Sequence, residues 1–455
     1  MEKLFPTPSN NARIGFQYFP DTYHYREADL ITWLPELVAM GAQWLVLETP
    51  AERAIPEDFL RPMISSGIEP ILKFNLTMTH PPDLEQISML IDVYAQWGVH
   101  YITLFDRPNT LAAWSQDTWV QQNLVNRFLN AFIPLAEYVS QAGIHPVFPG
   151  LEPGGNFWDT AFLRSALQEI KERGHTRLLK RMVIGAYAWS GEKSLNWGAG
   201  GPKAWPGVRP YFTPNDEQDH LGFRIFDWYT AITEDVLGHR LPMILLGTGA
   251  SQKRTPQPNQ TEKTRLPDGD INFSIANLLA GSYDASGQEE IFHPIPHHVI
   301  AGCFTQIFAN ARSAAAENAW FSAGGKAASV VDRMKQWTEK RKKEQNASKS
   351  GKPDPPHKKS SALKTKKPIK HYLLLPRYKW GIEEWYLEVT RPFIKKYRPT
   401  VGFSMREAFL AEKVTIIGGK QAFPERLVTE LERSGAKVVE ISGNGTEIAT
   451  KLARY

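Results

Sequence analysis

Between residue 13 and residue 338, short apolar segments alternate eight times with longer segments of helical periodicity. This alternation is typical of a parallel sheet whose strands are connected by covering helices. The predicted strands are Arg13–Phe19, Gln43–Glu48, Glu69–Asn75, His100–Phe105, Ile144–Pro149, Met182–Tyr187, Pro242–Leu246 and Cys303–Phe308. The predicted helices lie near 28–40, 56–66, 82–97, 117–142, 158–173, 218–238, 294–301 and 326–338. Eight such units predict an α/β fold, a TIM (β/α)8 barrel over residues 1–338.

An open, doubly wound sheet is the alternative architecture for the same alternation. That fold commonly carries a glycine-rich, phosphate-binding turn after its first strand. Here the first predicted strand is followed by Phe19-Pro20-Asp21, and Gly15 lies inside the strand. The sequence therefore favours the closed barrel.

After the barrel, residues 339–370 are rich in Lys, Ser and Pro and contain few large apolar side chains. Such a composition cannot bury enough surface to offset the entropy of ordering, so we predict a disordered linker. This segment carries twelve Lys and Arg against three acids, a charge of +9, whereas the whole chain carries +5 and the remainder therefore −4. The basic character thus belongs to the linker, and we predict no specific nucleic-acid partner.

Residues 371–455 predict a separate, small α/β module. Its predicted strands are His371–Leu375, Val414–Ile417 and Lys437–Ile441, and its predicted helices are Glu383–Tyr397, Phe423–Ser434 and Glu447–Ala453.

Composition narrows the class of protein. Hydrophobic residues make up 42% of the chain, but no run of about 18 apolar residues predicts a transmembrane helix. Residues 1–8 contain no apolar segment of the length of a secretory signal, so the default expectation is a cytoplasmic protein. The single cysteine, Cys303, excludes an internal disulfide and is expected in the core. His293, His297 and His298 flank prolines without a suitable acid nearby, and we expect no metal and no cofactor.

Two strand ends carry a family resemblance. The sequence after the fourth strand, Phe105-Asp106-Arg107-Pro108-Asn109, resembles the Trp-Asn-Glu-Pro-Asn motif of retaining β/α-barrel glycosidases of the cellulase and xylosidase type. The seventh strand, running from Leu241 to Gly249, resembles that family's Pro-x-x-x-Thr-Glu-x-Gly pattern. The likeness extends over about residues 13–338, and it implies a TIM barrel with a sugar-binding mouth.

The resemblance also implies which residues would be catalytic. In that family the motif glutamate after strand four is the general acid/base, and the glutamate on strand seven is the nucleophile. Here Arg107 and Gly247 occupy these positions. Because arginine keeps its proton at neutral pH and glycine has no side chain, the standard retaining mechanism cannot run on these residues.

Other acids follow predicted strands and are candidate catalytic groups: Glu48, Asp106 and Glu152. Asp106 and Glu152 come from neighbouring strands and could face each other across the mouth as a displaced acid/base pair. Alternatively, Asp106 pairs with Arg107, and Glu152 holds its Gly/Pro loop.

Aromatic and polar side chains at strand ends are candidates for binding a sugar, since flat rings stack on pyranose C–H faces. The candidate aromatic residues are Tyr18, Tyr187, Trp189, Trp197 and Trp205, and the candidate polar residues are Gln17, Asn75, Arg107 and Asn109. Two long insertions, 190–217 and 247–292, follow strand ends and are predicted to lie over the mouth.

The C-terminal module carries a second resemblance. Residues 414–427, 438–443 and 446–450 resemble one unit of the bacterial cell-wall-binding repeat (type 2), without the arginines usual near its end. That family binds anionic wall polymers, normally through three units. The resemblance implies an anionic polymer as partner of residues 339–455 and a location at the cell surface, in conflict with the cytoplasmic default.

Three hypotheses follow. The first is a glycosidase-like barrel that binds a carbohydrate or polysaccharide without standard retaining catalysis. The second is an active glycoside hydrolase with displaced carboxylates. The third is a scaffold protein of the bacterial cell surface, whose linker and tail recruit a polyanion.

Overall fold

The computed structural model divides the chain into two compact units, residues 1–351 and 352–455. The residues that the structure describes are 4–191, 193–209, 213, 217–250, 268–282, 292–309, 319–322, 327–349, 367, 369–376, 384–403, 405–418, 423, 428, 429, 431, 432 and 434–455.

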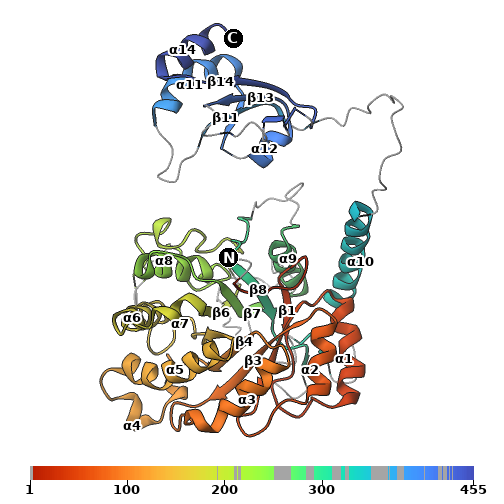
Figure 1. Ribbon diagram of the computed structural model, residues 1–455, viewed down its shortest axis with the longest axis vertical. Helices are drawn as coiled ribbons and strands as arrows, with labels where there is room; N and C mark the ends of the chain where they lie inside the picture. Colours follow the sequence, from red (N-terminus) through yellow and green to blue (C-terminus); the bar gives the residue numbers. More distant parts are fainter. Residues whose placement is uncertain are drawn as a thin grey trace, which may run out of the picture. The chain divides into compact units, whose positions relative to one another are not determined.

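The first unit is a closed barrel of eight parallel strands in sequence order (Figure 1). The strands are β1 Ile14–Gln17, β2 Trp44–Thr49, β3 Glu69–Leu76, β4 Tyr101–Phe105, β5 His145–Phe148, β6 Val183–Trp189, β7 Met243–Gly249 and β8 Val299–Phe304. Since β1 pairs with both β2 and β8, the sheet has no edge. The TIM barrel prediction is confirmed, and the open sheet is excluded.

Helices surround this barrel (Figure 1). They are α1 Glu27–Ala39, α2 Glu57–Ser65, α3 Leu84–Gln96, α4 Gln116–Trp119, α5 Leu124–Gln141, α6 Asp159–Glu172, α7 Thr176–Arg181, α8 Ile225–Leu237, α9 Asp268–Ala280 and α10 Ser329–Lys349, with short 3-10 turns at Leu111–Ala113 and Gly201–Lys203. Two short strands, β9 Phe308–Ala309 and β10 Phe321–Ser322, pair beside the barrel. The last helix, α10, packs beside α1, where Lys335 Nζ lies 2.7 Å from Glu36 Oε2.

The strand period of two separates two cores. On β2, Leu45 and Leu47 belong to the core between sheet and helices, whereas Trp44 and Val46 belong to the cluster inside the barrel. The interior cluster also holds Cys303, which is fully buried as expected. Continuing the alternation along β2 brings Glu48 to the inner side at the carboxyl end of the strand.

The prediction fails in the last barrel unit. Residues 294–301, predicted as a helix, form an extended segment with a turn and the start of β8, and the strand predicted at 303–308 lies four residues too late. Pro294 and Pro296 lack backbone N–H groups, and the β-branched run that begins at Val299 favours a strand. The helix that connects β7 to β8 is α9, which lies inside the segment interpreted as a polar loop insertion. The predicted helix 117–142 is also divided, into α4 and α5.

The closing helix is longer than predicted. α10 runs to Lys349, so residues 339–349 are helical and do not belong to a disordered linker. The reason is local: this part of the chain is rich in Glu, Lys, Arg and Gln, which have high helix propensity. Residues 350–366 and 368 of the predicted linker lie outside the described residues.

The second unit contains a parallel four-stranded sheet in the order β12-β11-β13-β14. Its elements are β11 Ile369–Leu374, α11 Glu384–Tyr397, β12 Thr400–Gly402, α12 Met405–Phe409, β13 Ala411–Ile417, β14 Lys437–Ile441 and α14 Gly445–Ala453. Separate apolar clusters cover its two faces. The small α/β module is confirmed, although β12 and α12 were not predicted, because three- and five-residue elements give almost no periodic signal. None of the helices described in either unit carries an apolar stretch long enough to cross a membrane.

A buried histidine makes barrel stability depend on pH. His298 is 5% exposed, and its Nε2 lies 2.7 Å from Thr230 Oγ1. Burial, followed by the nearby positive charge of Arg240, lowers the pKa of His298 to about 4. The unfolded chain binds this proton more readily than the folded protein. The contribution of His298 to the free energy of unfolding should therefore be fully present above pH 6.5 and should be lost between pH 6.5 and 4, by about 3 kcal/mol in total.

Urea unfolding between pH 4 and 7.5 measures this loss. His298→Gln should remove the part of the pH dependence between pH 6.5 and 4 that His298 contributes, and burial of His145, whose pKa is also lowered, leaves some slope in the same range. A variant that keeps the full slope would contradict the assignment to His298.

Candidate functional site

The carboxyl ends of β2 to β5 bring five charged side chains together at the mouth of the barrel. This mouth cluster consists of Glu48, Lys73, Asp106, Arg107 and Glu152. Lys73 Nζ lies 3.3 Å from Glu48 Oε1 and 3.1 Å from Asp106 Oδ2. Lys73 is only 8% exposed, so its charge is balanced inside the protein by two carboxylates from neighbouring strands.

Arg107 links the two carboxylates predicted to face each other. Its Nη1 donates to Asp106 Oδ2 at 2.9 Å, and its Nε lies 2.7 Å from Glu152 Oε2. The backbone of Arg107 has a positive φ of 45°, and its N–H donates to the Gly150 carbonyl at 3.0 Å. The predicted pairing of Asp106 with Arg107 is therefore observed, and the guanidinium lies between Asp106 and Glu152.

Tyr187 and Trp189 form a stacked aromatic pair next to this cluster. Their ring centroids are 4.9 Å apart, with planes 9° from parallel. Arg107 Cζ lies 4.1 Å from the Tyr187 ring centroid, and the Tyr187 hydroxyl donates to Asp106 Oδ1 at 2.5 Å. The indole Nε1 of Trp189, by contrast, is buried and has no hydrogen-bond partner in the part of the chain that the structure describes.

The aromatic pair fills the space over Gly247, the position implied for a nucleophile. A Cβ at Gly247 would lie 2.8 Å from Tyr187 Cδ1, 3.1 Å from Trp189 Cζ2 and 3.2 Å from Gln17 Nε2. Gln17 is held there by donating to the Leu246 carbonyl at 2.7 Å. No side chain fits at residue 247 without moving these groups.

The acids of the mouth cluster differ in electrostatic environment. Burial raises the pKa of Glu48, although Lys73 opposes this shift. Burial would also raise the pKa of Asp106, but the charges of Lys73 and Arg107 outweigh it and lower that pKa below its ordinary value. Glu48 is thus the carboxyl group that holds a proton more readily, and Asp106 is the one kept ionised.

Four of the predicted sugar-binding residues have other roles. Tyr18 is 1% exposed and packs in the core against Tyr25. Asn109 is fully buried; its Nδ2 donates to the carbonyls of Glu152 and Phe157, and its Oδ1 accepts from the Glu152 N–H, so it holds the loop after β5.

Trp197 and Trp205 belong to the described part of the 190–217 insertion. Trp197 Nε1 donates to Asp219 at 2.8 Å, and Trp205 Nε1 donates to the Ala199 carbonyl at 2.9 Å. The same insertion packs on α8, where Trp228 Nε1 donates to the Gly198 carbonyl. These tryptophans therefore stabilise the insertion, and no hydrogen bond or ring contact within the described ranges joins them to the Tyr187–Trp189 pair. Residues 251–267 and 283–291 of the other insertion lie outside the described residues.

Lys73 was not predicted from the sequence, although a signal exists. It lies two residues after Ile71 on β3, and Ile71 is inside the barrel. Its register partner on β2 is Glu48. A lysine at an inward position of an otherwise apolar strand predicts a buried ion pair. Asn75, a predicted polar sugar-binding residue two positions further along β3, donates a hydrogen bond to the Glu48 carboxylate.

Among the residues that the structure describes, no group of three or more His, Cys, Asp or Glu side chains is arranged to hold a metal ion. The cations that balance the carboxylates of the mouth cluster are Lys73 and Arg107.

Comparison of the sequence with protein-family models gives no match, and comparison with curated proteins gives none either. Solved structures do show similarity. A mutant of Saccharomyces cerevisiae Gas2p in complex with laminaritetraose and laminaripentaose is 10% identical over 72% of this chain and 63% of its own length, with a TM-score of 0.41. This chain therefore spans less than two thirds of that protein.

Two further structures are glycoside-cleaving enzymes by name. An endo-β-1,3-glucanase of family GH128 from Sorangium cellulosum is 12% identical over 71% of this chain and 97% of its own, with a TM-score of 0.38. A β-glucuronidase from Ruminococcus gnavus is 10% identical over 71% of this chain and 48% of its own, with a TM-score of 0.35. The barrel of this chain is established by its own strand pairing and does not depend on these values.

Proposed function

We propose that the barrel mouth binds a carbohydrate without the standard retaining mechanism. The observation that carries this proposal is the stacked Tyr187–Trp189 pair over Gly247. The space where a nucleophile on β7 would lie is filled by the rings of Tyr187 and Trp189 and by the side-chain amide of Gln17. Arg107 stands at the sequence position implied for the acid/base. This arrangement suits recognition better than covalent catalysis.

The chemistry of the mouth fits a sugar ligand. Trp189 is partly exposed, so part of its ring surface is open to a ligand. Arg107 and Glu152 are each about one third to one quarter exposed and are fixed by their ion pair. A ring face beside such fixed polar groups is the usual composition of a sugar subsite.

Truncation of the partly exposed ring tests the proposal. Trp189→Ala should weaken binding of a glycan identified on an array by at least about tenfold, because the stacking surface is lost. Isothermal titration calorimetry with the full chain measures the effect, and a reducing-sugar assay on the same glycan should detect no release.

The matched control is Trp97→Ala, since Trp97 follows α3 at the opposite end of the barrel. It should leave affinity within twofold. Equal loss in both variants, or no glycan bound by the intact chain, would overturn the proposal.

An active hydrolase is the second candidate. The pKa of Glu48 is raised and that of Asp106 is lowered, as expected for a general acid and an ionised carboxylate in one site. Glu48 Oε1 and Asp106 Oδ2 are both bound to Lys73 Nζ, so they lie no further apart than the sum of those two distances, 6.4 Å. Retaining enzymes hold their carboxyl groups about 5–5.5 Å apart. The buried ammonium group between the two carboxylates argues against this role, because it competes with the substrate for both.

The same reducing-sugar assay separates the candidates. Turnover by the intact chain that is abolished in both Glu48→Gln and Asp106→Asn would establish the hydrolase and overturn the binding-only proposal.

A further inference from the structure

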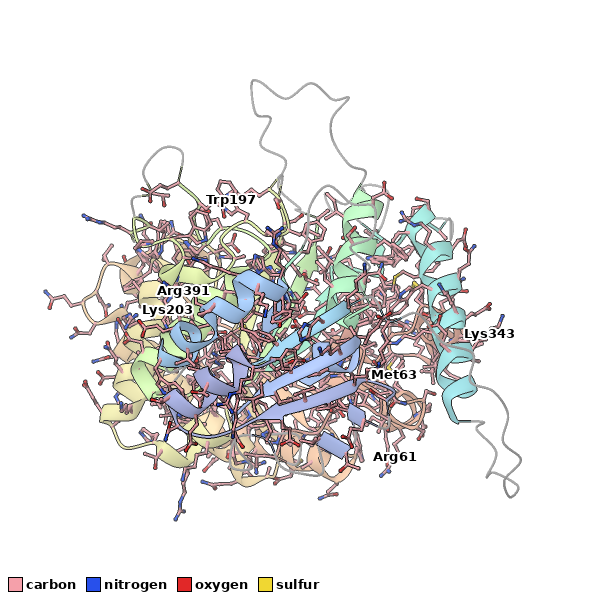
Figure 2. The ribbon with its side chains drawn as sticks, turned by 90° about the horizontal axis from the view of Figure 1, so that it is seen from above. Arg61, Met63, Trp197, Lys203, Lys343 and Arg391 are labelled. Carbon is pink, nitrogen blue, oxygen red and sulfur yellow. The ribbon has the colours of Figure 1, made fainter. Side chains whose placement is uncertain are left out.

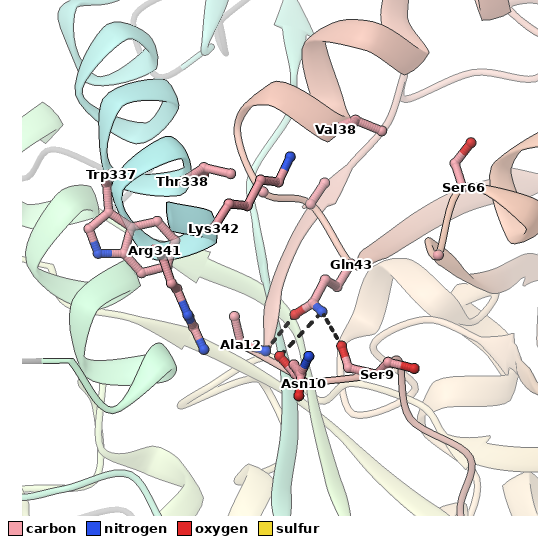
Figure 3. Close-up of a pocket in the computed structure, with 13 residues that line it drawn as sticks. Ser9, Asn10, Ala12, Val38, Gln43, Ser66, Trp337, Thr338, Arg341 and Lys342 are labelled. Carbon is pink, nitrogen blue, oxygen red and sulfur yellow. Dashed lines mark hydrogen bonds between the residues drawn. The ribbon is translucent and has the colours of Figure 1, made fainter. Parts of the chain in front are cut away.

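A cavity lies at the end of the barrel opposite the mouth cluster, where the strands begin. It has a volume of about 290 Å³ and is lined by the segment before β1, the turns that precede β2 and β3, and one face of α10 (Figure 3). No part of the mouth cluster contributes to it. It is therefore separate from the proposed carbohydrate site.

The α10 face of this cavity presents polar groups at helical spacing. Trp337, Thr338, Arg341 and Lys342 recur at intervals of three and four residues, which places them on one side of the helix. Arg341 Cζ lies 5.2 Å from the Trp337 ring centroid, so the indole helps to hold the guanidinium in place.

Two of these polar groups are buried and unsatisfied. Thr338 is 5% exposed, and neither its Oγ1 nor Arg341 Nη1 has a hydrogen-bond partner among the described residues. The neighbouring Gln43, by contrast, is fully used: it accepts from the Ala12 N–H and donates to the Ser9 carbonyl (Figure 3). An unsatisfied buried polar group destabilises the protein, and a ligand with suitable acceptors would recover that loss.

The charge of the cavity favours an anion. Arg341 and Lys342 line it, and none of the lining residues is acidic. Burial lowers the pKa of Arg341, as expected for a cation without a carboxylate partner. The C-termini of α1 and α2 also face the cavity, but each contributes only about half a negative charge, so the two full positive charges prevail.

We propose that this cavity is a binding site for a small molecule bearing a carboxylate or phosphate group, held by Arg341, Lys342 and the Thr338 hydroxyl. A planar guanidinium donates two parallel hydrogen bonds to either oxyanion. The hydroxyl and the lysine then complete the contacts from the same helix face, and the Trp337 ring offers an apolar wall for the rest of the ligand.

Calorimetric titration of the full chain with inorganic phosphate and with glucuronate, at constant ionic strength, tests the site. Saturable binding of phosphate alone, of glucuronate alone or of both supports the proposal and separates the two oxyanions. Arg341→Gln should weaken binding at least about tenfold, since the charge-assisted hydrogen bonds are lost. The isosteric Thr338→Val should weaken binding about threefold or more. This second variant tests the proposal if Arg341→Gln does not fold.

Lys343→Gln is the matched control. Lys343 is exposed on α10, does not line the cavity and loses the same charge on substitution (Figure 2). It should leave affinity within twofold. The proposal fails if neither anion binds saturably, or if Lys343→Gln weakens binding as much as Arg341→Gln, because the attraction would then come from the general charge of the helix.

Discussion

Gly247→Glu is expected to lower the free energy of unfolding by about 4 kcal/mol or more and to create no glycosidase activity. The substitution places a glutamate where the family resemblance implies a nucleophile. The first added carbon already meets Tyr187 and Trp189 at 2.8 and 3.1 Å, so the stacked pair must move. The added carboxylate would also enter next to Tyr187, whose hydroxyl is already bound to the ionised Asp106.

Urea unfolding followed by circular dichroism measures this effect, with Gly247→Ala as the intermediate step at about 1–3 kcal/mol. Gly269→Ala is the control, because a Cβ at that helical position meets its nearest neighbour, Val330 Cβ, at an ordinary 3.5 Å. It should be neutral or slightly stabilising. A stable Gly247→Glu protein that cleaves glycosides would show that the mouth retains the catalytic geometry of the family, and our proposal would then be wrong.

Lys73→Met should destabilise the barrel by about 4 kcal/mol at neutral pH, since it leaves two mouth carboxylates without their shared buried cation. Asp106 is ionised in the folded protein partly because of Lys73, and Glu48 keeps its charge only against the cost of burial. The deficit should shrink as the pH falls toward the ordinary carboxyl range, because buried carboxylates that have lost Lys73 take up protons more readily. Unfolding curves at pH 7 and pH 4 measure the difference.

Lys335→Met is the matched control for this variant. Lys335 also pairs with a carboxylate, that of Glu36, but about one third of each side chain is exposed. A pair of this kind contributes about 0–1 kcal/mol. Adding Glu48→Gln and Asp106→Asn to Lys73→Met should restore part of the lost stability. Losses of similar size in Lys73→Met and Lys335→Met would argue against the buried charge network.

The barrel strands could be predicted from local patterns, whereas the end of the barrel could not. Seven of the eight predicted barrel strands overlap the observed ones closely, because each strand is an apolar run that must be buried on both faces. The eighth was misplaced around Pro294 and Pro296, where an extended segment and a short helix give similar patterns. α10 was predicted too short, since a run of basic residues is compatible both with a solvated helix and with a disordered segment.

At the site, the sequence indicated that Arg107 and Gly247 replace two carboxylates, and it indicated three other acids at strand ends. It did not indicate that Lys73 joins Glu48 to Asp106, that Asn109 holds the loop after β5, or that Trp197 and Trp205 bind their own insertion. Each of these roles depends on which strand register and which loop path bring distant residues together.

The sequence by itself determined the barrel and the loss of the two expected carboxylates, because burial periodicity and residue identity are properties of short segments. Only the tertiary structure decided what fills the resulting space: two stacked rings over a bare glycine, and a buried lysine between two acids. The physical reason is that the energy of a buried charge or a close ring contact depends on groups 25 to 81 residues away in sequence, whose distances are set only when the barrel closes.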